Sequence, residues 1–323
     1  MTPLYPLRFQ PLFRRYLWGG QRLATLLNKP IGDSATCAES WEICDHDADQ
    51  SIVAGGPLEG TTLANLVNER GGELLGRHAP QSRFPLLYKF LDAREKLSVQ
   101  VHPDDTRAAR LLPPDLGKTE AWVVLAAEPG SLIYAGLKRG FDRAALAREL
   151  SRGTCDLCLH SFSPQVGDCI FLPAGVVHAI GAGLVVAEIQ QASDTTWRLF
   201  DWNRVGPDGQ PRDLHIDAAL DAIDYAIGPV SPVRPMVTDE SQRERLVACD
   251  KFLLDRLTLS APREVVSDDR FHILSVLAGS VSISGDPVAR PLVLGDTILL
   301  PAQRGSTQLI PASSAIVLDA YLP

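Results

Sequence analysis

The sequence has no excess of positive charge, few cysteines and no long apolar run, and each shortage argues against a class of protein. Its 323 residues include 31 lysines and arginines against 39 aspartates and glutamates, which gives a formal net charge of -8. A general nucleic-acid binder needs a basic face for the phosphate backbone, so we expect no nucleic-acid partner. Six cysteines in a chain of this length do not make a disulfide framework.

The N-terminal region also lacks the pattern of a targeting or membrane-spanning segment. Arg8, Arg14 and Arg15 interrupt its apolar residues, so it has neither the apolar run of a signal peptide nor the roughly 18 apolar residues of a membrane span. We therefore expect a soluble, cytoplasmic protein with no membrane partner. Cys155 and Cys158 form a C-x-x-C pair, but no second pair follows at zinc-finger spacing, and we interpret the pair as structural.

Short strands separated by glycine and proline predict a mainly β protein of about two domains. The sequence of Gly167–Ala174 (GDCIFLPA) recurs with small changes as Gly295–Ala302 (GDTILLPA), which indicates two related β-barrels. We predict an N-terminal catalytic domain at residues 1–230, a proline-rich linker at 231–244 and a C-terminal domain at 245–323.

A few short helices are expected to interrupt this β pattern. Thr62 followed by apolar residues predicts a capped helix that ends at Gly71 and Gly72. Similar patterns predict helical segments within residues 105–112, 141–150 and 214–226.

Polar side chains alternate with apolar ones in two of the expected strands. Ser98, Gln100 and His102 are interleaved with leucine and valine, and Lys118 and Glu120 also fall at a spacing of two. Successive side chains of a strand point to opposite faces, so each strand should have one apolar face and one face that carries ligands. Two strands thus direct serine, glutamine, histidine, lysine and glutamate towards a shared space.

A third strand-turn unit after Gly167 adds His178 to this set. Imidazole nitrogens and carboxylate or amide oxygens suit zinc or a similar divalent metal. Gln100, His102, Glu120 and His178 are therefore the candidate metal ligands. Such a set leaves a position free for water or substrate, as a catalytic site requires.

The second half of the chain does not repeat this ligand set. Counting from the shared Pro-Ala, Ser306 falls opposite His178, and His272 is the only histidine after the linker. One imidazole seldom holds a metal, so we expect the second barrel to be metal-free and structural or oligomer-forming.

The sequence resembles a known family, the type I phosphomannose isomerases, which are zinc-dependent cupins. The resemblance covers most of the chain up to about Asn203. The large helical insertion of the longer members is absent, so the chain looks like the short bacterial form. Four ordered motifs carry the resemblance, and two further stretches extend it: Leu97–Asp105, Gly117–Glu120, Pro173–Gly175 with His178, and Trp197–Arg198, then Trp18–Gly20 and Ala38–Ile43.

The resemblance implies two cupin (jelly-roll) barrels and one zinc ion per chain. It implies that Arg198 is the catalytic arginine and that Asp194 and Lys118 lie at the reacting end of the sugar. It also places Ser98 close to the bound substrate. Lys118, two residues from Glu120, is a candidate for the proton-transferring base, although the sequence leaves the identity of that base open.

The chemistry that such a site supports is aldose–ketose isomerisation. A divalent ion polarises a carbonyl and its neighbouring hydroxyl, which acidifies the proton between them and stabilises the enediolate that forms. A base then carries the proton between C1 and C2. The guanidinium of Arg198 can hold the developing enediolate or a phosphate. We therefore expect an enzyme of mannose metabolism that interconverts mannose 6-phosphate and fructose 6-phosphate, as a monomer or homodimer.

Two other functions fit part of the pattern. An iron-dependent bicupin oxygenase also uses nitrogen and oxygen ligands, but Lys118 and Arg198 beside the metal suit an anionic sugar better than an apolar substrate. A non-enzymatic sugar-binding cupin would bind a ligand without turnover. It is disfavoured because all four metal positions and Arg198 occur together, whereas a disused site would be expected to lose one.

Overall fold

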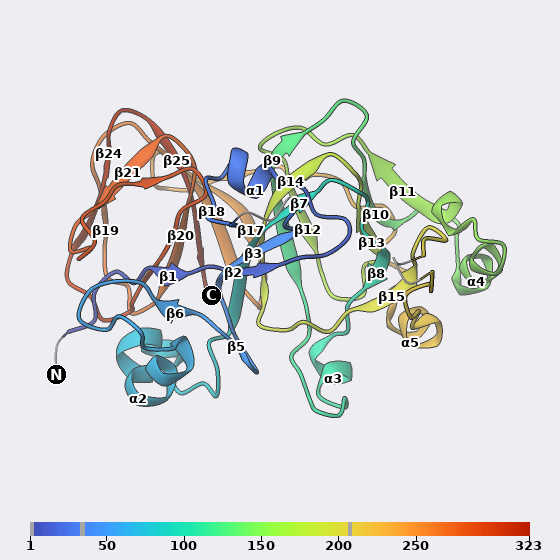
Figure 1. The fold of residues 1–323 in the computed structure, drawn as a ribbon, viewed down its shortest axis with the longest axis horizontal. Coiled ribbons are helices and arrows are strands. Elements are labelled where there is room, and N and C mark those ends of the chain that lie inside the picture. The colour runs from blue at the N-terminus through green and yellow to red at the C-terminus, as the bar shows by residue number, and fades with distance from the viewer. Residues whose placement is uncertain (1–2, 33–35, 206–208) are drawn as a thin grey trace.

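Antiparallel β-sheets form most of the molecule, and a few short helices lie at their edges (Figure 1). The computed structural model describes residues 3–32, 36–205 and 209–323. The mainly β expectation is confirmed. None of the helices in these residues is long and apolar enough to cross a membrane.

The first sheet pair is built from residues before about 200 and consists of a five-stranded and a six-stranded sheet. In spatial order the five-stranded sheet is β11 (Leu159–Phe162), β10 (Ile133–Leu137), β13 (His178–Ile180), β8 (Val99–Val101) and β15 (Trp197–Phe200). The six-stranded sheet is β12 (Cys169–Leu172), β9 (Glu120–Ala127), β14 (Leu184–Gln191), β7 (Leu86–Ala93), β3 (Glu39–Ile43) and β2 (Leu12–Arg14).

The second sheet pair is built from the C-terminal part of the chain. Its six-stranded sheet is β16 (Met236–Val237), β17 (Arg243–Ala248), β18 (Leu253–Leu259), β25 (Ala315–Tyr321), β20 (His272–Ala278) and β23 (Thr297–Leu300). Its four-stranded sheet is β19 (Arg263–Val265), β24 (Thr307–Pro311), β21 (Ser280–Ile283) and β22 (Leu292–Val293). β16 lies within the expected linker and pairs with β17.

The remaining elements are short. Two small ribbons pair β1 (Phe9–Gln10) with β6 (Ile52–Val53), and β4 (Asp45–His46) with β5 (Asp49–Gln50). The helices are α1 (Arg22–Thr25), α2 (Leu63–Leu75), α3 (Asp105–Ala108), α4 (Arg143–Ser151) and α5 (Ile216–Ala222), with 3-10 turns at Gly76–His78 and Cys155–Cys158.

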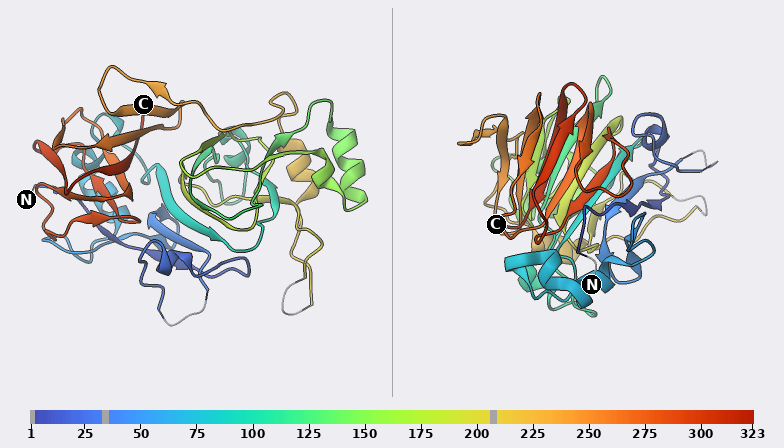
Figure 2. Two further views of the ribbon diagram at one scale, coloured as in Figure 1. Left: turned by 90° about the horizontal axis from the view of Figure 1, so that it is seen from above. Right: turned by 90° about the vertical axis from the view of Figure 1, so that its left-hand side faces the viewer.

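The largest apolar core lies between the two six-stranded sheets. It joins side chains of β9 and β14 to side chains of β18, β20 and β25: Ala121, Val123, Ile189, Leu254, Ile273 and Ala320. Because burial of apolar surface is the main favourable term in folding, this core fixes the two sheet pairs against each other. Figure 2 shows them side by side, with α4 and α5 at the end of the first sheet pair that is remote from the second.

Two further cores enclose the first sheet pair. One fills the space between its sheets and includes Trp122, Ile133 and Ile180. The other covers the outer face of the five-stranded sheet with Leu146 of α4 and Leu220 of α5. Both faces of each sheet are therefore occupied, and the polar residues described below are enclosed by packed layers.

The helix α2 begins as expected but does not end as expected. The Thr62 hydroxyl accepts a hydrogen bond from the Asn65 amide at 3.2 Å, which confirms the cap. The predicted end at Gly71 and Gly72 is partly correct, because the backbone kinks just before them, at Arg70 (φ -136°, ψ 26°), but helical structure resumes there and continues to Leu75. Its Leu74 and Leu75 are fully buried in the largest core, and this packing outweighs a cost of about 1 kcal/mol for each glycine in a helix.

The repeated strand-turn motif occupies equivalent places in the two sheet pairs. Leu172 in the first copy pairs with Glu120, and its counterpart Leu300 in the second copy pairs with His272. In the same register Glu188 of β14 corresponds to Asp319 of β25. The second sheet pair thus has polar residues of its own at positions that match those of the first.

In the second sheet pair these positions belong to a buried network of ion pairs. His272 lies between Asp319, at 2.8 Å from Nδ1, and Asp268, at 3.2 Å from Nε2. Arg243 reaches both Asp319 and Asp255, at 3.2 and 3.0 Å. Burial works to lower the pKa of His272, but the two carboxylates beside it outweigh burial and raise that pKa above its ordinary value.

We expect this network to stabilise the fold most strongly at acidic to neutral pH. Since the pKa of His272 is higher in the folded chain than in the unfolded chain, its contribution is complete below about pH 6.5 and is lost as the pH rises through the folded value. His272→Gln should lower the free energy of unfolding by about 1–3 kcal/mol at pH 6 and by less at pH 9. Urea unfolding of parent and variant at both pH values measures this.

His160→Gln, on β11 of the first sheet pair, makes the same exchange of residue types outside this network and is the matched control for the substitution itself. A cost of His272→Gln that stays the same from pH 6 to pH 9 would contradict the assignment of a charged ring.

Candidate metal centre and substrate cleft

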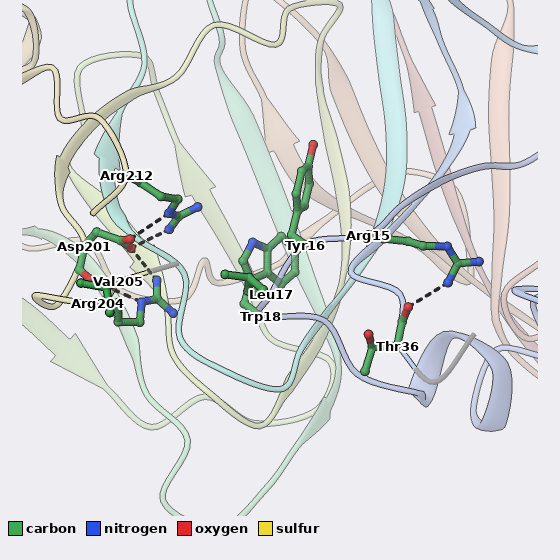
Figure 3. Close-up of a pocket in the computed structure, with 9 residues that line it drawn as sticks. All are labelled: Arg15, Tyr16, Leu17, Trp18, Thr36, Asp201, Arg204, Val205 and Arg212. Atoms are coloured by element: carbon green, nitrogen blue, oxygen red, sulfur yellow. Dashed lines mark hydrogen bonds and ion pairs between the residues drawn. The ribbon is translucent and has the colours of Figure 1, made fainter. Parts of the chain in front are cut away.

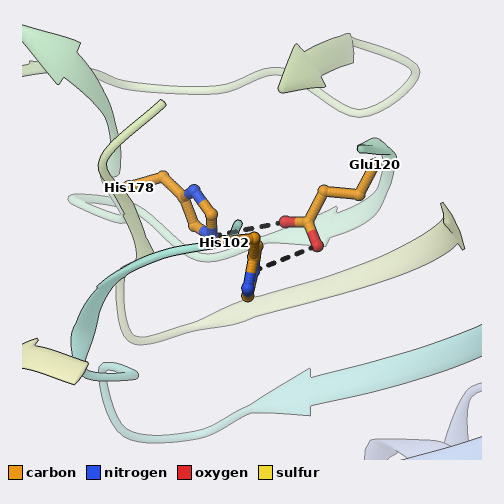
Figure 4. Close-up of side chains that lie close together, drawn as sticks. All are labelled: His102, Glu120 and His178. Atoms are coloured by element: carbon orange, nitrogen blue, oxygen red, sulfur yellow. Dashed lines mark ion pairs between the residues drawn. The ribbon is translucent and has the colours of Figure 1, made fainter. Parts of the chain in front are cut away.

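Three side chains from three different segments meet inside the first sheet pair. His102 directly follows β8, Glu120 begins β9 and His178 begins β13, and each is about 1% exposed. The His102 Nε2 and His178 Nε2 atoms lie 3.4 and 3.3 Å from the two oxygens of Glu120. Candidate ligand atoms of all three lie within 4.8 Å of one another (Figure 4). The predicted convergence of these three residues is confirmed.

Backbone carbonyls orient both imidazoles. His102 donates from Nδ1 to the Thr195 carbonyl at 3.0 Å, and His178 donates from Nδ1 to the Val176 carbonyl at 2.9 Å. A ring that donates from Nδ1 has its lone pair on Nε2, so both lone pairs face Glu120. Hydrogen bonds of this kind fix the tautomer and the orientation of metal-ligating histidines.

The charge states at this site also suit a metal. Burial, assisted by Lys118, lowers the pKa of His102 to about 3, and burial lowers the pKa of His178 as well. Burial works to raise the pKa of Glu120, but the neighbouring Lys118 ammonium holds it well below its ordinary value. Near neutral pH the site therefore offers two neutral imidazoles and a carboxylate, which are the forms that bind metal.

One oxygen of Glu120 supports the same conclusion. Its Oε1 atom is buried and has no hydrogen-bond partner among the described residues. A buried carboxylate oxygen without a partner is costly, and a cation between this oxygen and the His178 nitrogen would compensate it. The donor set of two imidazoles and one carboxylate fits zinc or a similar divalent ion.

Gln100 lies beside these three residues. It is on β8, where it pairs with His178 of β13, and its Nε2 is 3.4 Å from the His178 Nε2. Rotating the amide by 180° places its oxygen there instead, and the two orientations differ only in how the hydrogen-bond network is assigned.

A cleft of about 290 Å³ runs beside the cluster, and the sequence-predicted residues Ser98, Gln100, Lys118, Asp194 and Arg198 all line it. The structure therefore brings these five residues together along one cleft.

Lys118 makes the closest contacts to the cluster. Its Nζ lies 2.6 Å from Glu120 Oε2 and 3.1 Å from His102 Nε2, and the side chain is buried. The same atom is 3.6 Å from Glu188 Oε1. The lysine therefore bridges the candidate ligands and a second buried carboxylate.

The sequence interpretation missed that second carboxylate. Glu188 is at the centre of β14, pairs with Lys89 at 3.4 Å, and Lys89 in turn lies 3.4 Å from Glu39. Burial raises the pKa of Glu188 to about 7, against the lowering effect of Lys89. A single acidic residue in the otherwise apolar run Leu184–Ile189 was the signal that could have revealed it.

Arg198 closes one side of the cleft. It lies on β15, paired with Gln100, and its Nη1 donates to the Asp213 carbonyl at 2.8 Å. Its Nε is buried without a hydrogen-bond partner among the described residues. Asp194 is exposed at the rim of the cleft.

A second, outer pocket of about 410 Å³ adjoins the cleft (Figure 3). The two share Tyr16, Trp18 and Arg212. Arg204 and Arg212 line the outer pocket, and each forms an ion pair with Asp201 at 2.5 Å. Sequence reasoning did not identify this group, because no motif distinguishes these arginines from ordinary surface residues.

Comparison with known proteins agrees with this geometry. Residues 6–119 match the model of the phosphomannose isomerase type I catalytic domain. The mannose-6-phosphate isomerase ManA of Bacillus subtilis is 35% identical over 288 residues, which cover 88% of this chain and 89% of the relative. This chain belongs to the type I phosphomannose isomerases. It is therefore an enzyme of the isomerase class.

A second relative and a solved structure support this assignment. The mannose-6-phosphate isomerase of Streptococcus mutans is 34% identical over 86% of this chain and 87% of its own. The crystal structure of the mannose 6-phosphate isomerase from Bacillus subtilis superposes with a TM-score of 0.89 at 29% identity, covering 98% of this chain and 99% of that one. The phosphomannose isomerase fold thus extends over the whole length, including the second sheet pair.

Proposed function

We propose that this isomerase interconverts mannose 6-phosphate and fructose 6-phosphate, with one zinc ion per chain. The observation that carries the proposal is the cluster of His102, Glu120 and His178 beside a cleft that is lined by Lys118 and Arg198. The names of its relatives in Bacillus subtilis and Streptococcus mutans support the choice of substrate.

Zinc would be held by His102, Glu120 and His178, with the amide oxygen of Gln100 as a fourth ligand. When bound, the ion acts as a Lewis acid on the carbonyl and hydroxyl oxygens of the sugar. A catalytic metal also needs a position that substrate oxygens can reach. The imidazole side chains of His102 and His178 are compact enough to leave such a position accessible.

Proton transfer is assigned to the residues at the edge of the cluster. We assign Lys118 Nζ to the proton that moves between C1 and C2, by way of an enediolate. Glu188 lies 3.6 Å from Lys118, and its pKa of about 7 lets it exchange a proton near neutral pH. Asp194, at the rim, is assigned to the same end of the sugar.

Arg198 is assigned as the catalytic arginine, which holds either the developing enediolate or the phosphate of the substrate, and Ser98 is assigned as a further substrate contact. A guanidinium forks onto phosphate or carboxylate oxygens, and the unpartnered Nε of Arg198 is free to donate to a ligand. Arg212 lies on the wall of the same cleft and adds a second positive charge.

Arg198→Lys should reduce kcat/KM for mannose 6-phosphate by about 10- to 100-fold, because a lysine keeps the charge but loses the forked geometry. Steady-state kinetics on mannose 6-phosphate and on unphosphorylated mannose measure the effect. A loss confined to the phosphorylated sugar assigns Arg198 to the phosphate, and an equal loss on both assigns it to the enediolate. The exposed Arg139→Lys is the control, and kinetics of Arg198→Lys equal to those of this control would contradict either role.

The direct test of the function is an isomerase assay coupled to fructose 6-phosphate detection, run on protein as purified, after chelation and after zinc is restored. We expect activity that chelation abolishes and zinc restores. Oxygen consumption without isomerisation would instead indicate a bicupin oxygenase, and sugar binding without turnover would indicate a binding protein.

We also propose that the two sheet pairs are two cupin barrels, with domain ranges 1–230 and 245–323 on either side of a linker at 231–244. The recurrence of the GDCIFLPA motif as GDTILLPA at equivalent registers supports this division. The second barrel is assigned a structural role without metal. A cytoplasmic location and a monomeric or homodimeric state stay predictions.

A further inference from the structure

Asp115 is a partly buried carboxylate that the proposed chemistry does not use. It lies between α3 and β9, and its side chain is only 11% exposed. Among the described residues it does not line the substrate cleft; it lines a neighbouring pocket that shares Asp194 and Thr196 with the cleft. Asp115 is therefore close to the site without facing the substrate.

The oxygens of Asp115 hold one loop of the site. Oδ2 accepts hydrogen bonds from the Ser193 and Thr195 hydroxyls, each at 2.8 Å. Oδ1 accepts from the Leu116 amide at 2.8 Å and lies 3.3 Å from His46 Nε2. Burial works to raise the pKa of Asp115. The hydrogen bonds from His46, from the Thr195 and Ser193 hydroxyls and from the Leu116 amide outweigh burial and hold that pKa well below its ordinary value.

The loop that Asp115 holds is connected to the metal ligands. The carbonyl of Thr195 accepts the Nδ1 hydrogen of His102 at 3.0 Å, so the position of this loop sets the direction of the His102 Nε2 lone pair. Asp194, between the two anchored residues, is the cleft residue assigned above to the reacting end of the sugar. One carboxylate thus supports a ligand-orienting carbonyl and a substrate-facing side chain.

We propose that Asp115 is a positioning residue for the metal centre, which acts by fixing the Ser193–Thr195 loop against His102. This inference rests on the proposed function, because it takes His102 as a metal ligand. Residues that hydrogen-bond to a metal-ligating side chain and fix its orientation typically contribute about 10- to 100-fold to metal affinity or activity.

The test compares Asp115→Ala and Asp115→Asn with the parent, using zinc alone as the probe. Competition with a chromogenic chelator gives the zinc Kd, and the coupled assay gives kcat and KM separately. We expect Asp115→Ala to weaken zinc binding by about 10- to 100-fold and to lower kcat more than it raises KM. Asp115→Asn keeps one oxygen acceptor for the loop and should recover part of the affinity.

The matched control is Asp47→Asn. Asp47 lines the same neighbouring pocket, is largely exposed, and its positive φ of 49° suits asparagine as well as aspartate. Within the described part of the chain Asp47 makes no hydrogen bond or ion pair with the Ser193–Thr195 loop, and we expect the zinc Kd of Asp47→Asn to equal that of the parent.

A purely structural role for Asp115 would lower the melting temperature and leave the zinc Kd within twofold of the parent, and that result would overturn the proposal. If Asp115→Ala does not fold, a Ser193→Ala, Thr195→Val double variant releases the loop while Asp115 stays in place, and it should weaken zinc binding in the same way. A parent that binds zinc but does not isomerise the sugar would refute the proposed function and leave this comparison of zinc affinities intact.

Discussion

Replacing Glu120 with glutamine should abolish metal binding and reduce turnover by about a thousandfold or more. Glu120 supplies the only carboxylate of the three-residue cluster, and the amide that replaces it carries no charge. A catalytic metal contributes several kcal/mol to the stabilisation of the transition state, and about 4 kcal/mol corresponds to a factor of a thousand in rate. Elemental analysis of the purified variant and the coupled isomerase assay measure the two effects.

The exposed Glu59→Gln is the control for this substitution, since it removes the same charge far from the cleft. A Glu120→Gln protein that retained one metal ion per chain and the turnover of the control would show that the chemistry lies elsewhere.

Lys118→Met is expected to have an effect of similar size on kcat. General acid–base catalysis contributes about 100- to 10,000-fold, so loss of the proton-carrying amine should lower kcat by that range. Exchange of the substrate C2 hydrogen with solvent deuterium, followed by NMR, should disappear in parallel because it reports the proton transfer itself. Zinc content should be determined for the same sample, since Lys118 lies 2.6 Å from Glu120.

Lys29→Met is the matched comparison for Lys118→Met. Lys29 is also buried and also pairs with a buried glutamate, Glu42, at 2.7 Å, but it is not part of the cleft lining. Both variants leave a buried carboxylate without its partner, which destabilises the fold by a few kcal/mol. Only Lys118→Met should lose turnover per folded molecule, and full turnover in Lys118→Met with bound zinc would remove Lys118 as the base.

The metal cluster could be predicted from the sequence because its signal is local. Gln100 and His102 alternate with buried valines, and a period of two assigns them to one face of a strand. The alternation did not extend to Leu97, which precedes β8 and packs with Trp122 between the two sheets instead of on the outer face with Val99.

Other parts of the site, which no motif marks, could not be predicted because they depend on contacts between segments far apart in the chain. Glu188 is placed opposite Lys118 by the pairing of β14 with β9, which no short motif encodes. The role of Asp115 depends on a loop 78 residues further along the chain. The hydroxyl of Ser193 in that loop donates a hydrogen bond to Asp115. Side chains that act through such distant neighbours leave no periodic pattern in the sequence.

The equivalent registers of the two sheet pairs hold different polar residues, which differ in how fully they are hydrogen-bonded. In the first sheet pair, one buried oxygen each of Glu120 and Glu188 has no hydrogen-bond partner among the residues that the structure describes. In the other half the corresponding positions, His272 and Asp319, are bonded to each other. The second sheet pair thus places matched charges at the positions where the first has carboxylate oxygens without hydrogen-bond partners, and the two are held together by the largest apolar core.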